Sequence, residues 1–228
     1  MTQLLISVTD IDEAQLALMH GADLIDLKDP HQGALGALPI ATIQEVVNFV
    51  NTHRTHPQQL TSATVGDLPM QADLILQDVL AVASTNVDFV KIGFFESEDY
   101  QPCLDALAEV AKNGVKLIAV LFAETTYPKH LVDLIKNAGF YGVMLDTSQK
   151  NGATFMHYYT HEQIMSFSRQ VKDHAMVFGL AGSLNIQHLE KVAIYTPTYI
   201  GFRGGVCVGD QRKQSLDGDK IKLIRKRL

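Results

Sequence analysis

The sequence has few cysteines and no long apolar run. Cys103 and Cys207 are its two cysteines in 228 residues, too few for the disulfide framework of a secreted protein. Neither stands near histidines at the spacing of a zinc site. No stretch approaches the roughly 18 apolar residues of a membrane-spanning helix. Acidic residues from Asp10 onward interrupt the apolar N-terminus, unlike a signal peptide. We therefore expect a protein of the reducing cytosol.

The sequence also lacks an excess of positive charge. Its 19 Lys and Arg against 25 Asp and Glu give a formal net charge of −6. A nucleic-acid-binding protein usually carries a basic field, so we expect neither a nucleic-acid nor a membrane partner. The one basic run, 220–227, follows Asp217 and Asp219. Such a run is typical of a final helix with cations at its C-terminal end.

Short apolar runs alternate with longer amphipathic runs eight times along the chain. Apolar strands without polar alternation are typical of a parallel sheet that is buried on both faces. Eight strand–helix units indicate a closed barrel rather than an open sheet, and no change in composition marks a domain boundary. The sequence therefore predicts a single α/β domain, residues 1–228, with the (β/α)8 TIM-barrel fold. The expected strands are 4–8, 22–28, 60–65, 87–93, 115–122, 140–145, 175–180 and 199–202.

Some helix starts and loops carry local signals. Asp10 followed by Glu13 has the form of a capping box, and we expect Ser183 to cap a helix that runs to about residue 192. Gly33 and Gly36 belong to a short loop that lacks the spacing and the lysine of a nucleotide-binding loop. We interpret that loop as a mobile flap beside the second expected strand.

Polar residues stand at the carboxyl ends of the even-numbered strands, where a barrel places its active site. They are Asp26 and Lys28 on the second strand, Lys91 on the fourth, and Asp146 with Lys150 on the sixth. Alternate strands contribute to the same layer of side chains inside a barrel. We therefore expect these three lysines and two aspartates to converge on one small space.

Each of these residues also has a purely structural interpretation. Lys91 could form a structural ion pair, Lys28 could be a solvated strand end, and Asp146 could simply cap a turn. The combination favours chemistry, because a neutral lysine amine attacks a carbonyl to form an iminium, which acts as an electron sink. Burial or a neighbouring cation favours the neutral amine, and nearby aspartates assist proton transfer. The residues alone do not decide which lysine is the nucleophile.

Glycine-rich segments follow the last two expected strands. Gly182 and Ser183 follow the seventh, and Arg203, Gly204 and Gly205 follow the eighth. In phosphate-binding barrels these two loops hold the phosphate through backbone N–H groups, and an arginine adds a charge-assisted contact. Either cluster alone could be a tight turn. Their joint occurrence favours a phosphate site.

Five segments, taken together, resemble the (5-formylfuran-3-yl)methyl phosphate synthase family, also described as 4-(hydroxymethyl)-2-furancarboxaldehyde-phosphate synthases. The Asp-Leu-Lys-Asp-Pro motif around Lys28 and the Leu-Asp-Thr motif of Asp146, followed by Lys150, are the most specific parts. The resemblance spans nearly the whole chain. Its segments are 4–8, 21–30 with 33–36, 89–93, 143–147 with Lys150, and 179–184.

The resemblance implies a lyase that condenses two molecules of glyceraldehyde 3-phosphate into 4-(hydroxymethyl)-2-furancarboxaldehyde phosphate, with loss of one phosphate and two waters. This is an early step of methanofuran biosynthesis. It implies Lys28 as the Schiff-base lysine, Lys91 as the proton acceptor, and Asp26, Asp146 and Lys150 as supporting catalytic residues. The implied partner is a small sugar phosphate, with no metal or organic cofactor.

Two other functions fit the same residues. One is a Schiff-base aldolase that acts on another sugar phosphate. The other is a barrel that binds a sugar phosphate without catalysis. The sequence does not fix the oligomeric state, although barrels often form homo-oligomers, and it assigns no role to the loop 151–159.

Overall fold

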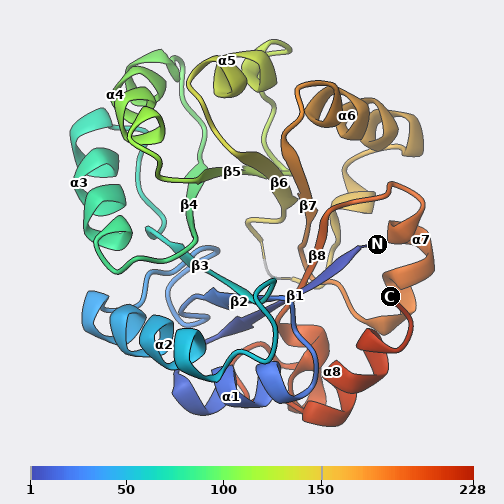
Figure 1. The fold of residues 1–228 in the computed structure, drawn as a ribbon. Helices are drawn as coiled ribbons and strands as arrows, with labels where there is room; N and C mark the ends of the chain where they lie inside the picture. The colour runs from blue at the N-terminus through green and yellow to red at the C-terminus, as the bar shows by residue number, and fades with distance from the viewer. Residues whose placement is uncertain (1, 150) are drawn as a thin grey trace.

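The computed structural model describes residues 2–149 and 151–228, and in this part of the chain eight parallel strands close into a barrel. Each strand is followed by a helix that returns along the outside of the barrel, as Figure 1 shows. The strands are β1 (Gln3–Val8), β2 (Leu24–Leu27), β3 (Leu60–Thr64), β4 (Phe89–Phe94), β5 (Leu117–Phe122), β6 (Gly142–Asp146), β7 (Val177–Leu180) and β8 (Tyr199–Phe202). The α-helices are α1 (Ile11–Met19), α2 (Ile40–His53), α3 (Ala72–Ala83), α4 (Gln101–Lys112), α5 (Leu131–Asn137), α6 (His161–Asp173), α7 (Leu189–Ala193) and α8 (Gly218–Arg225).

The pairing of the first and last strands closes the barrel. Gln3 of β1 lies opposite Tyr199 of β8, and every other strand pairs in parallel with its neighbours in sequence order. The predicted TIM-barrel fold is therefore confirmed. The same register sets Asp26 beside Ser62 and Thr64 beside Lys91, so polar side chains of β2, β3 and β4 enter the same end of the barrel.

The strand starts and helix caps show where local prediction was sound. Asp10 caps α1 as predicted, because its carboxylate accepts the backbone N–H of Glu13 at 2.9 Å. The Glu13 carboxylate accepts the N–H of Thr9 rather than that of Asp10, so the capping box is incomplete. Strand β7 begins at Val177, two residues later than predicted, since Ala175 has a positive φ of 55° that a strand does not adopt.

The helix predicted to start at Ser183 is the clearest local error. Ser183 has φ +52° and lies in the loop. Asn185 is the cap, and its side chain accepts the N–H of Gln187 at 3.0 Å. A 3-10 turn, Ile186–His188, then leads into α7. The loop after β7 is therefore longer than predicted, and its backbone N–H groups before Asn185 are not part of a helix.

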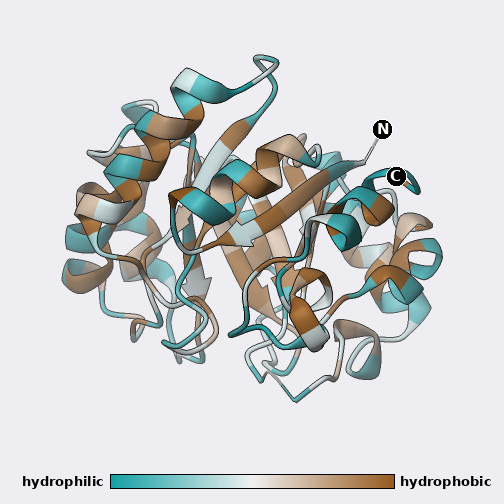
Figure 2. Cartoon of the chain, turned by 90° about the horizontal axis from the view of Figure 1, so that it is seen from below, coloured by the Kyte–Doolittle hydropathy of each residue, from teal (hydrophilic) through white to brown (hydrophobic). Residues whose placement is uncertain are grey.

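Apolar side chains fill two regions of the barrel. The larger core lies between the strands and the helices, and Figure 2 shows the strands hydrophobic and the outer helix faces hydrophilic. A smaller cluster lies inside the barrel. It includes Leu5, Leu24, Phe89, Ile118, Met144 and Tyr199. No helix in the described part of the chain is long and apolar enough to cross a membrane.

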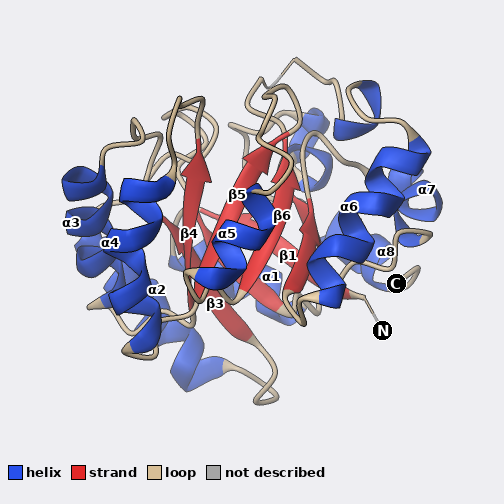
Figure 3. Cartoon of the chain, turned by 90° about the horizontal axis from the view of Figure 1, so that it is seen from above, coloured by secondary structure: helices blue, strands red, loops and turns tan. Residues whose placement is uncertain are grey.

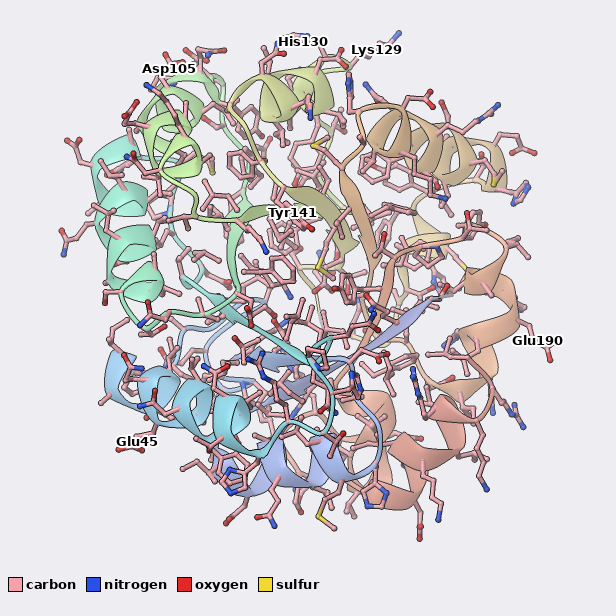
Figure 4. The ribbon with its side chains drawn as sticks, viewed as in Figure 1. Glu45, Asp105, Lys129, His130, Tyr141 and Glu190 are labelled. Atoms are coloured by element: carbon pink, nitrogen blue, oxygen red, sulfur yellow. The ribbon has the colours of Figure 1, made fainter. Side chains whose placement is uncertain are left out.

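Aromatic side chains close the end of the barrel at which the strands begin. Phe89 stacks on Tyr141 with 5.3 Å between the ring centroids and meets Tyr199 edge to face at 6.4 Å. The Lys116 ammonium lies 5.3 Å from the Tyr141 ring centroid. Tyr141 lies near the barrel axis in Figure 4, whereas Glu45 projects outward. The strands point away from this end, towards the long loops in Figure 3.

Candidate active site

A cavity of about 620 Å³ opens at the carboxyl ends of the strands. Its floor carries Asp26, Lys28, Lys91 and Asp146, and its wall is built from the loops after β7 and β8. Four of the five predicted catalytic residues therefore line one cavity. The fifth, Lys150, lies outside the described residues.

Asp26 and Lys91 form a buried ion pair on the floor of the cavity. The Lys91 Nζ atom lies 2.9 Å from Asp26 Oδ1, and the two residues are 4% and 1% exposed. Two hydroxyls hold the same carboxylate: Ser62 Oγ donates to Oδ1 at 2.6 Å and Ser7 Oγ donates to Oδ2 at 2.9 Å. The carboxylate thus accepts three donors. Such a set fixes its orientation and offsets the cost of burying the charge.

Lys28 and Asp146 form a second, looser pair. Lys28 Nζ lies 3.6 Å from Asp146 Oδ2, and Asp146 Oδ1 accepts the backbone N–H of Thr147 at 2.7 Å. Strand β2 ends at Leu27 and β6 ends at Asp146, so both groups stand where the strands give way to loops. This contact is longer than the 2.9 Å between Lys91 and Asp26.

The two pairs together can support amine chemistry. Lys28 and Asp146 are 7% and 5% exposed, so all four charged residues are largely buried. Burial strengthens the electrostatic interactions among them. Lysine is rarely buried without a partner, and Lys28 and Lys91 each pair with a carboxylate from another strand. The structural interpretation of Lys91 as an ion-pair member is correct, but the pair faces the cavity.

The glycine-rich loops after β7 and β8 pack closely against their neighbours. A Cβ atom on Gly182, which has φ +100°, would lie 2.9 Å from the Thr147 backbone nitrogen. A side chain on Gly205 would collide with Leu184 and Asn185 of the other loop. Both glycines line the cavity with Ser183 and Gly204. Glycine at these positions lets the two backbones meet and turn towards a ligand.

Arg203 uses its side chain inside the protein. Its Nη1 and Nη2 atoms bind both carboxylate oxygens of Glu13. Its remaining N–H groups donate to the carbonyls of Ser7 at 3.1 Å, Arg212 at 2.9 Å and Gln214 at 3.2 Å. A guanidinium has five N–H donors, and these contacts occupy them all. Direct phosphate binding by Arg203 stays a prediction, and it would require one of these bonds to exchange.

The loop predicted as a mobile flap is anchored on both sides. The Asp67 carboxylate accepts the N–H groups of Ala34 and Leu35, each at 2.7 Å. From the loop after β8, Arg212 Nη2 donates to the carbonyl of Gly33 at 3.1 Å. The Leu35 side chain is fully buried. The flap therefore forms a fixed wall beside Lys28 in this structure.

Sequence reasoning missed several residues of the site. Ser7 and Ser62 were hidden inside strands, although two hydroxyls on inward positions beside Asp26 were a usable signal. His188, at the end of the 3-10 turn after β7, and Arg212, in the loop after β8, also line the cavity. The backbone N–H of Asn185 donates to His188 Nδ1 at 3.0 Å, and burial lowers the pKa of His188. Among the described residues, no three His, Cys, Asp or Glu side chains cluster as metal ligands would.

Solved structures show the same fold in distant proteins. Phosphoribosyl anthranilate isomerase from Thermus thermophilus superimposes with a TM-score of 0.69 at 15% identity, covering 99% of this chain and 98% of that chain. A 3-hexulose-6-phosphate synthase from Salmonella typhimurium gives a TM-score of 0.64 at 13% identity, covering 99% of both chains. Fold and site together define a (β/α)8 barrel with paired amines and carboxylates at the carboxyl ends of its strands.

Sequence comparison identifies the family. The chain belongs to the 4-HFC-P synthase family, whose sequence pattern matches residues 4–225. A (5-formylfuran-3-yl)methyl phosphate synthase of Methanococcus maripaludis is 30% identical over 237 residues, covering 98% of each chain. A relative from Methylorubrum extorquens, whose name assigns the same activity provisionally, is 39% identical over 220 residues, covering 96% of this chain and 88% of its own. The predicted family is confirmed, and its members are lyases.

Proposed function

We propose that this protein condenses two molecules of glyceraldehyde 3-phosphate into (5-formylfuran-3-yl)methyl phosphate, with release of one phosphate and two waters, as a step of methanofuran biosynthesis. The observation that carries the proposal is the cavity in which the Lys28–Asp146 and Lys91–Asp26 pairs meet the glycine loops. The amines there can form an iminium and convert it to an enamine, and they lie beside loop backbone that can bind a phosphate. The family and its full-length relatives support the same reaction.

In the proposed mechanism Lys28 is the nucleophile. One triose phosphate, isomerised to its ketone, reacts with the Lys28 amine, and the carbinolamine loses water to give an iminium. Asp146, 3.6 Å from the amine, accepts and returns the protons of that step. The neighbouring C–H then loses its proton, and its electron pair flows into the iminium to give an enamine.

Lys91 is the proposed acceptor of that proton, after its ammonium has passed a proton to the Asp26 carboxylate 2.9 Å away and become a neutral amine. Its amine is fixed by Asp26, which Ser7 and Ser62 hold in place, so it approaches the substrate from the floor of the cavity. The enamine carbon attacks the aldehyde of the second triose and forms the new C–C bond. Loss of phosphate and water, ring closure and hydrolysis from Lys28 give the furan. Because the product ring is aromatic, this series of reaction steps is hard to reverse.

Gly182, Ser183, Gly204 and Gly205 are the proposed phosphate-binding residues. Their loops meet at the cavity wall, and backbone N–H groups on tight glycine turns bind anions without a side chain in the way. Holding a phosphate there leaves the carbonyl end of the triose free to reach the lysines. This arrangement assigns phosphate binding to the loops after β7 and β8, and chemistry to the ends of β2, β4 and β6.

Trapping the Schiff base tests the proposal. We expect borohydride, added with glyceraldehyde 3-phosphate, to leave a stable adduct that peptide mass spectrometry places on Lys28. Product NMR should show a furan aldehyde, which separates this reaction from a simple aldol addition. The Lys28→Met variant, treated in parallel, should give no adduct. An adduct on Lys150, or none with the unaltered protein, would contradict the assignment of Lys28.

A further inference from the structure

We infer that Arg212 binds a second phosphate, the one that the reaction releases, beside the Schiff-base lysine. This inference rests on the proposed function, because that reaction brings two phosphate esters into one cavity and expels one of them. The glycine loops after β7 and β8 provide one anion site. The cavity, of about 620 Å³, is large enough for a second. Arg212 lies further along the loop after β8, and its side chain extends away from the glycines to the Gly33 carbonyl in the loop after β2.

The hydrogen bonds of the two arginines separate their roles. Arg203 spends all five of its N–H donors on Glu13 and three backbone carbonyls. Arg212 lines the same cavity and, among the described residues, donates one side-chain hydrogen bond, to the Gly33 carbonyl at 3.1 Å. Five donors less that one leave four N–H groups. A guanidinium presents such donors as a planar fork that matches phosphate oxygens.

Hydrogen bonds fix the backbone of Arg212 in one position. The Arg203 Nε atom donates to the Arg212 carbonyl at 2.9 Å, and Glu13 of α1 fixes Arg203 in turn. Arg212 itself reaches across to the flap. An antiparallel β-bridge between Cys207 and Leu216 closes its loop. The guanidinium is therefore carried by a braced loop rather than by a free one, which reduces the entropy lost on binding.

Arg212 lines the same cavity as Lys28 and Asp146. Burial lowers the pKa of Arg212, and the Asp146 carboxylate acts in the opposite direction. Asp146 is the partner of Lys28, so a phosphate on Arg212 would stand beside the carbon chain attached to Lys28. The half-buried position of Arg212 strengthens its attraction for a dianion relative to an exposed arginine.

A cation at this position serves the elimination step. A base removes a proton from the carbon next to the ester carbon, and the C–H electron pair becomes the new double bond. The C–O bond to phosphate breaks, and its pair leaves on the phosphate oxygen. The Arg212 fork bonds to the oxygens that gain this charge, so it stabilises the transition state more than the ester.

Phosphate titration and kinetics test the inference. Inorganic phosphate, followed by calorimetry and 31P NMR, should bind at two sites on the unaltered protein and at one site on Arg212→Gln. The kcat for furan formation should fall about 100-fold in Arg212→Gln, and less in Arg212→Lys, which keeps the charge but loses the fork. The yield of borohydride trapping on Lys28 should stay within about 3-fold, since iminium formation precedes elimination.

Arg169→Gln, which removes an exposed arginine of α6, is the matched control. It should change neither the number of phosphate sites, nor kcat, nor the trapping yield.

Two results would overturn the inference. One is an Arg212→Gln protein that still binds phosphate at two sites with unchanged affinity, even if it is slow, because Arg212 would then only fasten the flap. The other is unchanged kcat. Failure of the proposed function looks different: the unaltered protein would give no Lys28 adduct and no furan, whatever the phosphate titration shows.

Discussion

The two ends of the barrel interior are built from different chemistry on the same strands. Strand β4 begins with Phe89, which stacks on Tyr141, and two positions later carries Lys91, which pairs with Asp26. Strand β6 likewise contributes Met144 to the apolar cluster and ends at Asp146. One end is a hydrocarbon and aromatic plug, and the other is a set of buried charges.

The difference teaches that the barrel separates stability from chemistry along its axis. Apolar burial at the plug contributes roughly 25 cal/mol per Å² removed from water. Buried ion pairs return little net stability, because desolvation offsets their attraction. Burial raises the pKa of Tyr199, at the plug, to about 12, so its hydroxyl stays neutral. The plug therefore supports a site whose charges the fold would not retain for stability alone.

Removing the Lys28 amine, at the charged end of the barrel, should have the largest effect on activity. We expect Lys28→Met to lower kcat about 10⁴-fold or more, as loss of a covalent nucleophile does. The measurement is furan formation under single-turnover conditions. Phe167→Leu, a substitution in α6 away from the cavity, is a suitable control. A Lys28→Met protein with substantial activity would contradict covalent catalysis at this position.

Truncating Phe89, at the aromatic end of the barrel, should lower stability and leave kcat nearly unchanged. We expect Phe89→Ala to lower the free energy of unfolding by about 3 to 5 kcal/mol, because it leaves a cavity under the site and removes two aromatic contacts. The kcat of the folded protein should stay within about 3-fold. Urea denaturation and steady-state kinetics at low temperature measure the two quantities. Loss of kcat without loss of stability would mean that the two ends are not separate.

Ser62→Ala sharpens the comparison within the charged end. The Ser62 hydroxyl donates to Asp26 Oδ1 at 2.6 Å, and a hydrogen bond to a buried charge contributes about 1.5 to 3 kcal/mol. We expect a loss of about 2 kcal/mol in unfolding free energy and a lower kcat, because the partner of Lys91 is less well held. Ser84→Ala is the control, since Ser84 is exposed and its hydroxyl donates to the Ala81 carbonyl of its own helix rather than to a charged group. It should cost under about 0.5 kcal/mol, and an equal effect in both variants would contradict the prediction.

The smallest expected effect concerns pH and His188. Burial lowers the pKa of His188 below the ordinary 6.5, so the unfolded chain binds a proton more readily than the folded one. His188 therefore contributes stability above pH 6.5 that is lost as the pH falls towards its lower folded pKa. We expect His188→Gln to flatten this part of the pH dependence by under about 1 kcal/mol. Denaturation at pH 7.5 and 5.5 measures it, with His130→Gln, which changes an outward-facing residue of the α5 rim, as control. An unchanged slope in His188→Gln would refute it.

Regular periodicity explains why much of the fold was predictable. Strand β8 was predicted at its observed bounds, and Asp10 caps α1 as expected. Prediction failed where backbone conformation is set by distant contacts. The loop after β7 turns through Ser183 in a left-handed conformation, which a serine does not signal. The sequence pattern there looked like a helix start, and the actual cap is Asn185.

The candidate site was predictable in part for the same reason. Alternation along β2 and β4 puts Asp26 and Lys91 on inward positions, and the even-strand rule brings them to one layer. Nothing local says that Ser62 completes the pair or that Arg203 is spent on Glu13, because these contacts join residues 36 and 190 positions apart. Pairing in the barrel alone decides them.

The sequence by itself therefore determined the barrel, its strand order and the family, since hydrophobic period and local motifs are properties of neighbouring residues. Tertiary structure decided which charge meets which. Lys91 binds Asp26 and Lys28 lies beside Asp146 because strand register and barrel closure fix distances that no local pattern encodes. The same closure brings Arg212 to the cavity and commits Arg203 elsewhere.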